Sequence, residues 1–234
     1  MKLHLLQKLI DDFLLKRLHP NDTSWYFPHS IVDHFHKQWK AGNDLDLKEK
    51  YNQSLRSDIS QRWWKKDHYR PKEIMLQLID TDAELALIAF KDLANDSASL
   101  DGRISRFQFY TEDLLQMLRQ KDSRISETYH HQDAHIMSLY LAGLFPDKYA
   151  LYPGLEVFKN YCMAVGSPEV PVIDDLVRYM KVASIVFTFI QKNENFSILS
   201  NIRRSELHRI AFIPYQTSYE FISYVGGNTE FSGS

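Results

Sequence analysis

The sequence predicts an all-α fold, an irregular bundle of about eight to ten helices. Apolar residues recur at intervals of three and four along most of the chain, as on one face of a helix. Aromatic residues make up 13% of the composition, whereas only eight of the 234 residues are glycine, which favours long elements over a turn-rich β architecture. With 44% hydrophobic and 25% charged residues, the composition is that of a globular chain with a core.

The first half of the chain carries six predicted helices. The first ends before Pro20, because the residue before proline avoids the α region. Pro71 suits the first position of the fourth helix, and Thr81 or Asp82 opens the fifth. The polar stretch 95–99 separates the fifth helix from the sixth. The predicted ranges are 3–18, 31–39, 44–66, 71–79, 82–93 and 104–118.

The second half carries three more predicted helices, over residues 136–144, 157–165 and 173–187. Residues 193–200 are predicted to form a loop. Over residues 217–225 the pattern alternates with a period of two, which predicts a short strand or an extended tail.

The organisation predicted is one helical domain over residues 1–225, with a subdivision near 95–102 as the alternative. Residues 226–234 are small and polar, which predicts a flexible tail or linker. Asp11 and Asp12 interrupt the first apolar run, so we expect no signal peptide. The longest apolar run is shorter than the roughly 20 residues that cross a bilayer. A single cysteine fits a reducing compartment, so we expect a cytoplasmic protein with no membrane partner.

Charge is segregated along the chain although the net charge is −2. Residues 56–72 hold six basic side chains against two acidic ones, and residues 73–101 hold seven acidic side chains against one lysine. Such segregation can give a near-neutral protein opposed charged faces.

The segment 62–70 interleaves cations with aromatic rings. One interpretation is a nucleic-acid site, in which cations neutralise phosphates and a ring stacks on a base. The alternative is a helix end whose cations complement the helix dipole. Trp63 continues an apolar stripe and is expected to pack inward. The candidate binding residues are Arg62, Trp64, Lys65, Lys66, Tyr69 and Arg70.

The turn 145–152 links two predicted helices and contains three aromatic residues. Loops usually run over the surface, so these rings need partners. They either pin the two helices together or offer a stacking pocket to a ligand base. In the second case Tyr149 and Tyr152 would join the nucleic-acid site.

Catalytic motifs are absent from the sequence. It has no phosphate-binding glycine loop, no paired CxxC and no HExxH. His130, His131 and His135 form the densest histidine cluster, but two helical ligands without the glutamate of a zinc protease motif do not make a metal site. Cys162 is expected to be a buried structural thiol. We therefore predict no catalytic residue, no metal and no cofactor, and a chain that is not an enzyme.

An apolar helix over residues 136–144 runs into the turn Pro146-Asp147-Lys148-Tyr149, and Val157–Tyr161 follows. Over about residues 130–190, this pattern resembles the N-terminal regions of McrB-like AAA+ ATPases of bacterial restriction systems. The resemblance implies a module that recognises DNA, often modified DNA, and acts beside a nucleotide-driven motor. Because this chain has no Walker A motif, the motor or nuclease would lie on another domain or chain.

Three hypotheses follow. The first is a non-catalytic nucleic-acid recognition domain, with modified DNA as one candidate ligand, in a bacterial restriction or phage-defence system. The second is a helical scaffold that binds a protein partner through the acidic segment 73–101 or an aromatic patch. The third is a metal-dependent enzyme built on the histidine cluster 130–135.

Overall fold

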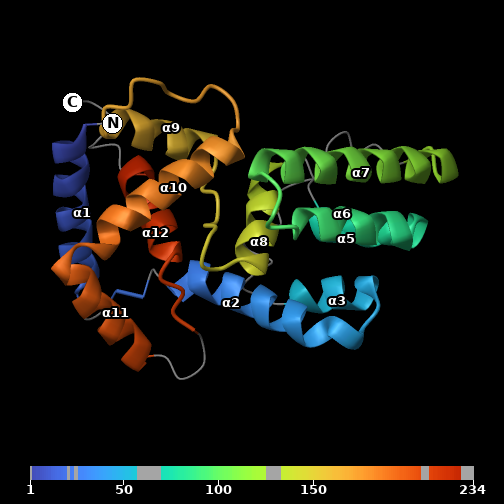
Figure 1. The fold of residues 1–234 in the computed structure, drawn as a ribbon, viewed down its shortest axis with the longest axis horizontal. Helices are drawn as coiled ribbons and strands as arrows, with labels where there is room; N and C mark the ends of the chain where they lie inside the picture. Colours follow the sequence, from blue (N-terminus) through green and yellow to red (C-terminus); the bar gives the residue numbers. More distant parts are fainter. Residues whose placement is uncertain are drawn as a thin grey trace. The chain divides into compact units, whose positions relative to one another are not determined.

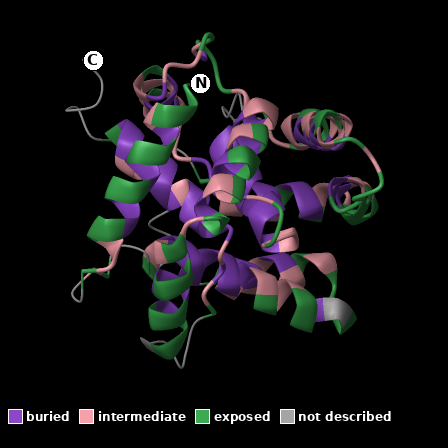
Figure 2. Ribbon diagram, turned by 60° about the vertical axis from the view of Figure 1, so that its left-hand side comes forward, coloured by how far each residue is buried: buried purple, intermediate pink, exposed green. Residues whose placement is uncertain are grey.

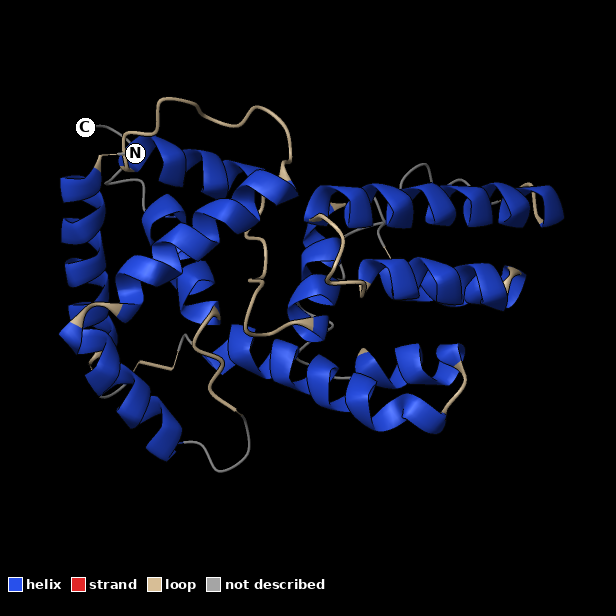
Figure 3. Ribbon diagram, viewed as in Figure 1, coloured by secondary structure: helices blue, strands red, loops and turns tan. Residues whose placement is uncertain are grey.

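The fold is known from a computed structural model, which describes residues 2–19, 22–23, 26–56, 70–124, 133–206 and 211–227 (Figure 1). Within these residues the regular structure consists of eleven α-helices and one short 3-10 helix, and no strand occurs (Figure 3). The all-α prediction is confirmed, with one helix more than the upper end of the expected range. None of the described helices is long and apolar enough to cross a membrane.

The chain forms two compact units. Unit 1 consists of Met1–Asp33 and Phe145–Ser234, and unit 2 is His34–Leu144. The predicted single domain over residues 1–225, with a subdivision near 95–102 as the alternative, stays a prediction. The 95–102 stretch lies inside unit 2.

Unit 1 is built around the packing of its last helix. Its helices are α1 (Leu3–Arg17), the beginning of α2 (Tyr26–Ala41), α9 (Leu155–Ala164), α10 (Leu176–Gln191), α11 (Glu194–Glu206) and α12 (Gln216–Gly227). Helix α12 packs most closely against α9. A Cβ at Gly226 would collide with the Val157 carbonyl, so the glycine permits this close approach.

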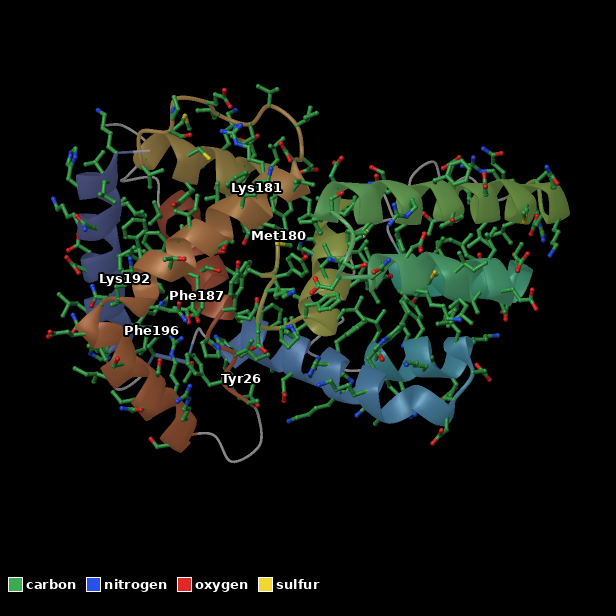
Figure 4. The ribbon with its side chains drawn as sticks, in the orientation of Figure 1. Tyr26, Met180, Lys181, Phe187, Lys192 and Phe196 are labelled. Carbon is green, nitrogen blue, oxygen red and sulfur yellow. The ribbon has the colours of Figure 1, made fainter. Side chains whose placement is uncertain are left out.

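Aromatic side chains fill the core of unit 1. The Phe221 ring lies 5.5 Å from that of Phe13 and 5.9 Å from that of Tyr161, both edge to face. Phe187 of α10 and Phe196 of α11 make a similar edge-to-face contact at 6.1 Å (Figure 4). The buried positions follow one stripe of each helix, as an amphipathic pattern predicts (Figure 2).

Unit 2 contains the helices whose starts were easiest to predict. It comprises the rest of α2, η1 (Gly42–Asp44), α3 (Leu47–Ser54), α5 (Pro71–Thr81), α6 (Ala83–Leu93), α7 (Leu100–Lys121) and α8 (Ala134–Leu144). Pro71 occupies the first position of α5, as predicted. The Asp82 carboxylate accepts a hydrogen bond from the Leu85 N–H at 2.9 Å, and so caps α6.

Tyr140 of α8 lies at the centre of the core of unit 2. Its ring centroid is 5.5 Å from that of Phe90, 5.9 Å from that of Phe107 and 6.0 Å from that of Tyr51. The Tyr51 and Tyr140 hydroxyls share a hydrogen bond of 2.6 Å. Every residue of α8 from Ala134 to Gly143 is buried, so no face of this stretch is exposed.

The expected loop over residues 193–200 is wrong, because Glu194–Glu206 form helix α11. The polar residues 193–195 suggested a loop, but the Asn193 side chain accepts a hydrogen bond from the Asn195 N–H at 3.0 Å, at the start of the helix. Phe196, Leu199 and Arg203 are buried on one face. A charged residue in the buried stripe obscured the helical period.

The expected strand over residues 217–225 is also wrong, because these residues lie in α12. Thr217, Ser218 and Glu220 are buried together with Phe221 and Val225, so polar residues occupy part of the inward face. Gly226 and Gly227, assigned to a flexible tail from the sequence, complete the helix. Residues 228–234 lie outside the described part of the chain.

The predicted helix over residues 44–66 begins later and ends earlier than expected. Helix α3 covers Leu47–Ser54. Tyr51 and Leu55 are fully buried, as the predicted apolar stripe requires. Leu55 itself already lies outside the helix. The rest of the stripe falls in residues 57–69, which the structure does not describe.

Candidate nucleic-acid interface

The predicted nucleic-acid-binding residues fall into three groups. Arg62, Trp64, Lys65, Lys66 and Tyr69 lie within residues 57–69, outside the described part of the chain. Arg70 is described and belongs to unit 2, whereas Tyr149 and Tyr152 belong to unit 1.

Lys72 holds the end of α3 against the beginning of α5. Its Nζ donates hydrogen bonds to the carbonyls of Asn52 at 3.0 Å and Leu55 at 3.4 Å. These carbonyls lie at the C-terminal end of α3, where an ammonium group is favourable. The C-terminal end of α3 and the N-terminal end of α5 therefore lie next to each other in unit 2.

Two exposed arginines lie next to these two helix ends. Arg56 follows α3, and Arg70 directly precedes α5. Burial lowers the pKa of Lys72, and the nearby Arg56 charge acts in the same direction, against the acids Glu73 and Glu49. Arg56 is therefore close enough to Lys72 for their charges to interact. The two described ends of the segment 57–69 thus bring basic residues together.

Tyr152 does not form a stacking site, which corrects the prediction for this residue. Its ring is 1% exposed and contacts Tyr179 edge to face at 5.0 Å. Its hydroxyl donates a hydrogen bond to Asp174 Oδ1 at 2.8 Å. Because its faces are covered inside unit 1, no base can stack on it in this conformation. The interpretation in which these aromatics pin helices holds for Tyr152, which packs against α9 and α10.

Tyr149 is more accessible and remains a candidate. Its side chain is half-buried, and its ring meets the Phe145 ring edge to face at 5.9 Å. The Gln216 side-chain amide donates to the Tyr149 carbonyl at 3.0 Å and accepts from the Leu151 N–H at 3.1 Å. Helix α12 thereby fixes the backbone of the aromatic turn.

Three of the seven acidic side chains in the segment 73–101 form ion pairs within unit 2. Asp80 pairs with Lys48 at 2.7 Å, Asp92 with Arg106 at 2.9 Å and Asp96 with Arg103 at 3.4 Å. Asp82 caps α6. The segregation of charge along the sequence is therefore reduced by pairing in the fold, which weakens this segment as an acidic docking face.

The histidine cluster and the cysteine provide no catalytic centre among the described residues. His130 and His131 lie outside the described part, and His135 is buried on α8. The described residues contain no group of three or more His, Cys, Asp or Glu that could hold a metal. Cys162 is buried as predicted, and burial raises the pKa of its thiol to about 11, although Arg178 lowers it. A protonated thiol is a weak nucleophile.

His29, Arg203 and Glu220 form a buried ionic cluster in unit 1 that no sequence pattern indicated. The Glu220 carboxylate accepts hydrogen bonds from Arg203 at 2.8 and 2.9 Å. His29 Nδ1 accepts the Ile213 N–H at 2.9 Å, so Nε2 carries the proton and donates to Glu220 Oε1, also at 2.9 Å. His29 and Glu220 are 191 positions apart, and no local pattern links them.

The cluster has the features of a structural element. All three side chains are buried, and the hydrogen bonds above join them to one another and to the Ile213 N–H. Arg17 lies 4.0 Å from Glu220 and also binds Asp22 at 3.1 Å, which extends the network to α1. A buried acid beside a histidine suggests catalysis, but a site also needs access for a substrate, and these groups face one another.

Comparison with known proteins leaves the family open: no family model, no curated protein and no solved structure matches this chain.

Proposed function

We propose that this chain is a non-catalytic nucleic-acid recognition domain, and that it binds through the basic residues between α3 and α5. The observation that carries the proposal is the convergence of Arg56 and Arg70 beside Lys72 at the two ends of the segment 57–69. That segment contains the predicted cations and aromatic rings, Arg62, Trp64, Lys65, Lys66 and Tyr69. Clustered cations favour phosphate, and accessible rings favour unpaired bases.

The resemblance of residues 130–190 to the N-terminal regions of McrB-like restriction ATPases also supports the proposal. It suggests DNA, including modified DNA, as the ligand, and an AAA+ motor or nuclease as a partner on another domain or chain. In that setting the protein works in the cytoplasm as part of a restriction or phage-defence system. Tyr149 stays a separate candidate contact within unit 1, whereas the buried Tyr152 is left out.

The alternative, a scaffold that docks a protein through the acidic segment, receives less support. Three of its acidic side chains are paired with basic side chains of the same unit, and a fourth caps a helix. A hydrophobic partner interface would also respond little to salt, which distinguishes it from phosphate binding.

The test is fluorescence anisotropy with labelled single-stranded, double-stranded and cytosine-modified DNA at two salt concentrations. Two double variants probe the site: Arg56→Ala with Arg70→Ala, and Lys65→Ala with Lys66→Ala. Each removes two cations, so each should reduce the steepness of the log–log salt dependence by roughly 1.8 on duplex DNA.

The matched control is Lys121→Ala with Arg124→Ala, which removes two exposed cations at the C-terminal end of α7. Lys121 Nζ contacts the Thr81 carbonyl, at the far end of α5 from Lys72. The control should bind DNA like the wild type. Absence of binding at about 100 µM folded protein in low salt would refute the proposal, because even non-specific DNA binding is tighter than that.

A further inference from the structure

Helix α6 buries one face within unit 2 and exposes the opposite one. The helix packs against α5 and α7. Its exposed face carries two large aliphatic side chains, Leu87 and Ile88, which are 39% and 45% exposed. Because the two are adjacent, they form a small apolar patch that a partner can cover. The buried residues of the opposite face are Ala86, Ala89, Phe90 and Leu93.

The apolar patch is flanked by one charge of each sign. Glu84 lies one turn before Leu87 and Ile88, and Lys91 lies one turn after them, so the four side chains share one face of the helix. Both charged residues are exposed. They are seven positions apart, too far to pair with each other within the helix. No ion pair in the described part of the chain involves either of them.

The other acidic residues of this region are engaged within unit 2. Asp80 pairs with Lys48 at 2.7 Å, and Asp92 pairs with Arg106 of α7 at 2.9 Å. The Asp82 carboxylate caps α6. The two flanking charges are therefore the ones that this face offers to a partner.

The order of side chains along this face is self-complementary when two copies of the helix run antiparallel. A two-fold axis between positions 87 and 88 places Glu84 of each copy opposite Lys91 of the other. It also places Leu87 opposite Ile88, and each of these contacts occurs twice in the dimer. A parallel arrangement would place like charges opposite each other, which favours the antiparallel one.

We propose that α6 is a self-association surface, on which a second copy of this chain docks antiparallel about a two-fold axis between Leu87 and Ile88. The aliphatic side chains form the centre of the contact, and two Glu84–Lys91 ion pairs close its ends. An apolar centre with a charged rim is the usual composition of a protein interface. The inference is independent of the proposed function, because it involves no nucleic acid.

The size of this face indicates a weak and reversible dimer. A helix of eleven residues is about 16 Å long and about 10–12 Å across. One such face is smaller than the roughly 800 Å² that each partner buries in a standard stable interface. We therefore expect monomers at low micromolar concentration and dimers above a concentration on the order of 0.1 mM.

The first experiment is sedimentation equilibrium of the full chain from about 5 to 500 µM, without DNA. Ile88→Ser removes an apolar contact twice per dimer, so it should weaken self-association at least about tenfold. The matched control is Ile185→Ser on α10 of unit 1, because Ile185 is also 45% exposed. The control should associate like the wild type.

The second experiment exchanges the charges. Glu84→Lys and Lys91→Glu each place like charges opposite each other across the two-fold axis, so each should weaken self-association at least about tenfold. An equimolar mixture of the two variants restores both complementary pairs and should form a heterodimer of nearly wild-type affinity. Each substitution also puts an unfavourable charge near a helix end. Mixing does not change that cost, so recovery in the mixture identifies the contact itself.

Three results would overturn the inference. A wild type that stays monomeric up to about 500 µM has no such dimer. If Ile88→Ser associates like Ile185→Ser, the contact lies on another face. If the two charge variants are folded by circular dichroism but do not associate when mixed, the antiparallel pairing is wrong. The proposed function stands in all three cases, because DNA anisotropy tests it separately.

Discussion

The Arg203 guanidinium donates one hydrogen bond to each carboxylate oxygen of Glu220, at 2.8 and 2.9 Å, inside unit 1. The pair joins α11 to α12, and His29 of α2 adds a third element through Glu220. Three helices that were poorly predicted or far apart in sequence are therefore held together by one carboxylate.

Replacing that carboxylate should strongly destabilise unit 1. Glu220→Gln leaves the Arg203 charge buried without its counter-charge, so we expect the free energy of unfolding to fall by about 3–5 kcal/mol. Urea denaturation measures the change. The control is Glu156→Gln, since Glu156 is exposed and only 3.9 Å from Lys159. That variant should change stability by less than about 1 kcal/mol. Similar midpoints for the two variants would contradict the structural role of the pair.

Stability should fall as the pH falls below about 6.5 because of His29. Burial lowers the pKa of His29 from its ordinary value of 6.5, against the opposing hydrogen bond and charge of Glu220. Its folded pKa lies below its unfolded pKa, so this contribution is complete above pH 6.5 and is lost on acidification. Protonation would also place a second N–H against the Ile213 N–H.

The His29→Gln variant tests this pH dependence. Urea unfolding at about pH 7.5, 6.5 and 5.5 should show a steeper loss in the wild type than in the variant. Parallel curves would show that the pKa of His29 is the same in the folded and unfolded states.

At lower pH, the loss of stability is due to Glu220. Burial alone would raise the pKa of Glu220, but the charges and hydrogen bonds of Arg203 and His29 hold it at about 2, so its contribution is lost as the pH falls from about 4.5 towards 2.

The close approach of α8 to α2 should make Gly143 intolerant of a side chain. A Cβ at this position would overlap the Phe35 ring, so Gly143→Ala should destabilise the protein by about 1–3 kcal/mol. Gly227→Ala is the matched control, because a Cβ there meets nothing within 4 Å. It should be neutral or slightly stabilising in a thermal melt. If Gly143→Ala were equally harmless, the two helices could separate without loss.

The hydroxyl pair of Tyr51 and Tyr140 should be energetically coupled. Removing one hydroxyl deprives the other of this hydrogen bond in a buried setting. Each single variant should therefore lower the free energy of unfolding by about 1–3 kcal/mol. Removing both leaves no unsatisfied pair. A double-mutant cycle with Tyr51→Phe and Tyr140→Phe should therefore show a double variant less destabilised than the sum of the single variants. Strict additivity would mean that the 2.6 Å contact contributes nothing.

Local signals were sufficient for much of unit 2. Pro71 at the start of α5 and Asp82 at the cap of α6 act through their own backbone neighbourhood, so sequence reasoning located both. The polar break before Leu100 is of the same kind, and Ser99 caps α7 there.

The end of unit 1 could not be predicted in this way. Glu220 and Arg203 are buried because they pair with each other and with His29, and that pairing exists only in the folded chain. Considered alone, their charges indicated solvent exposure and broke the helical periods of α11 and α12. The candidate site shows the same limit. The cations of residues 56–72 were visible in the sequence, but the approach of Arg56 to Lys72 depends on the hydrogen bonds that hold α3 against α5.

The discontinuity of unit 1 has a consequence during translation. Phe13 packs against Phe221, so 208 residues (221 minus 13) separate α1 from its partner in α12. At roughly 5–20 residues per second, the apolar face of α1 waits about 10–40 s for that partner. Unit 2 is complete much earlier, and its entry and exit are already joined by the His36 Nδ1–H···O=C hydrogen bond to Gly143, at 2.7 Å. We expect unit 2 to fold first on the ribosome, while the nascent α1 exposes an apolar stripe of the kind that chaperones bind.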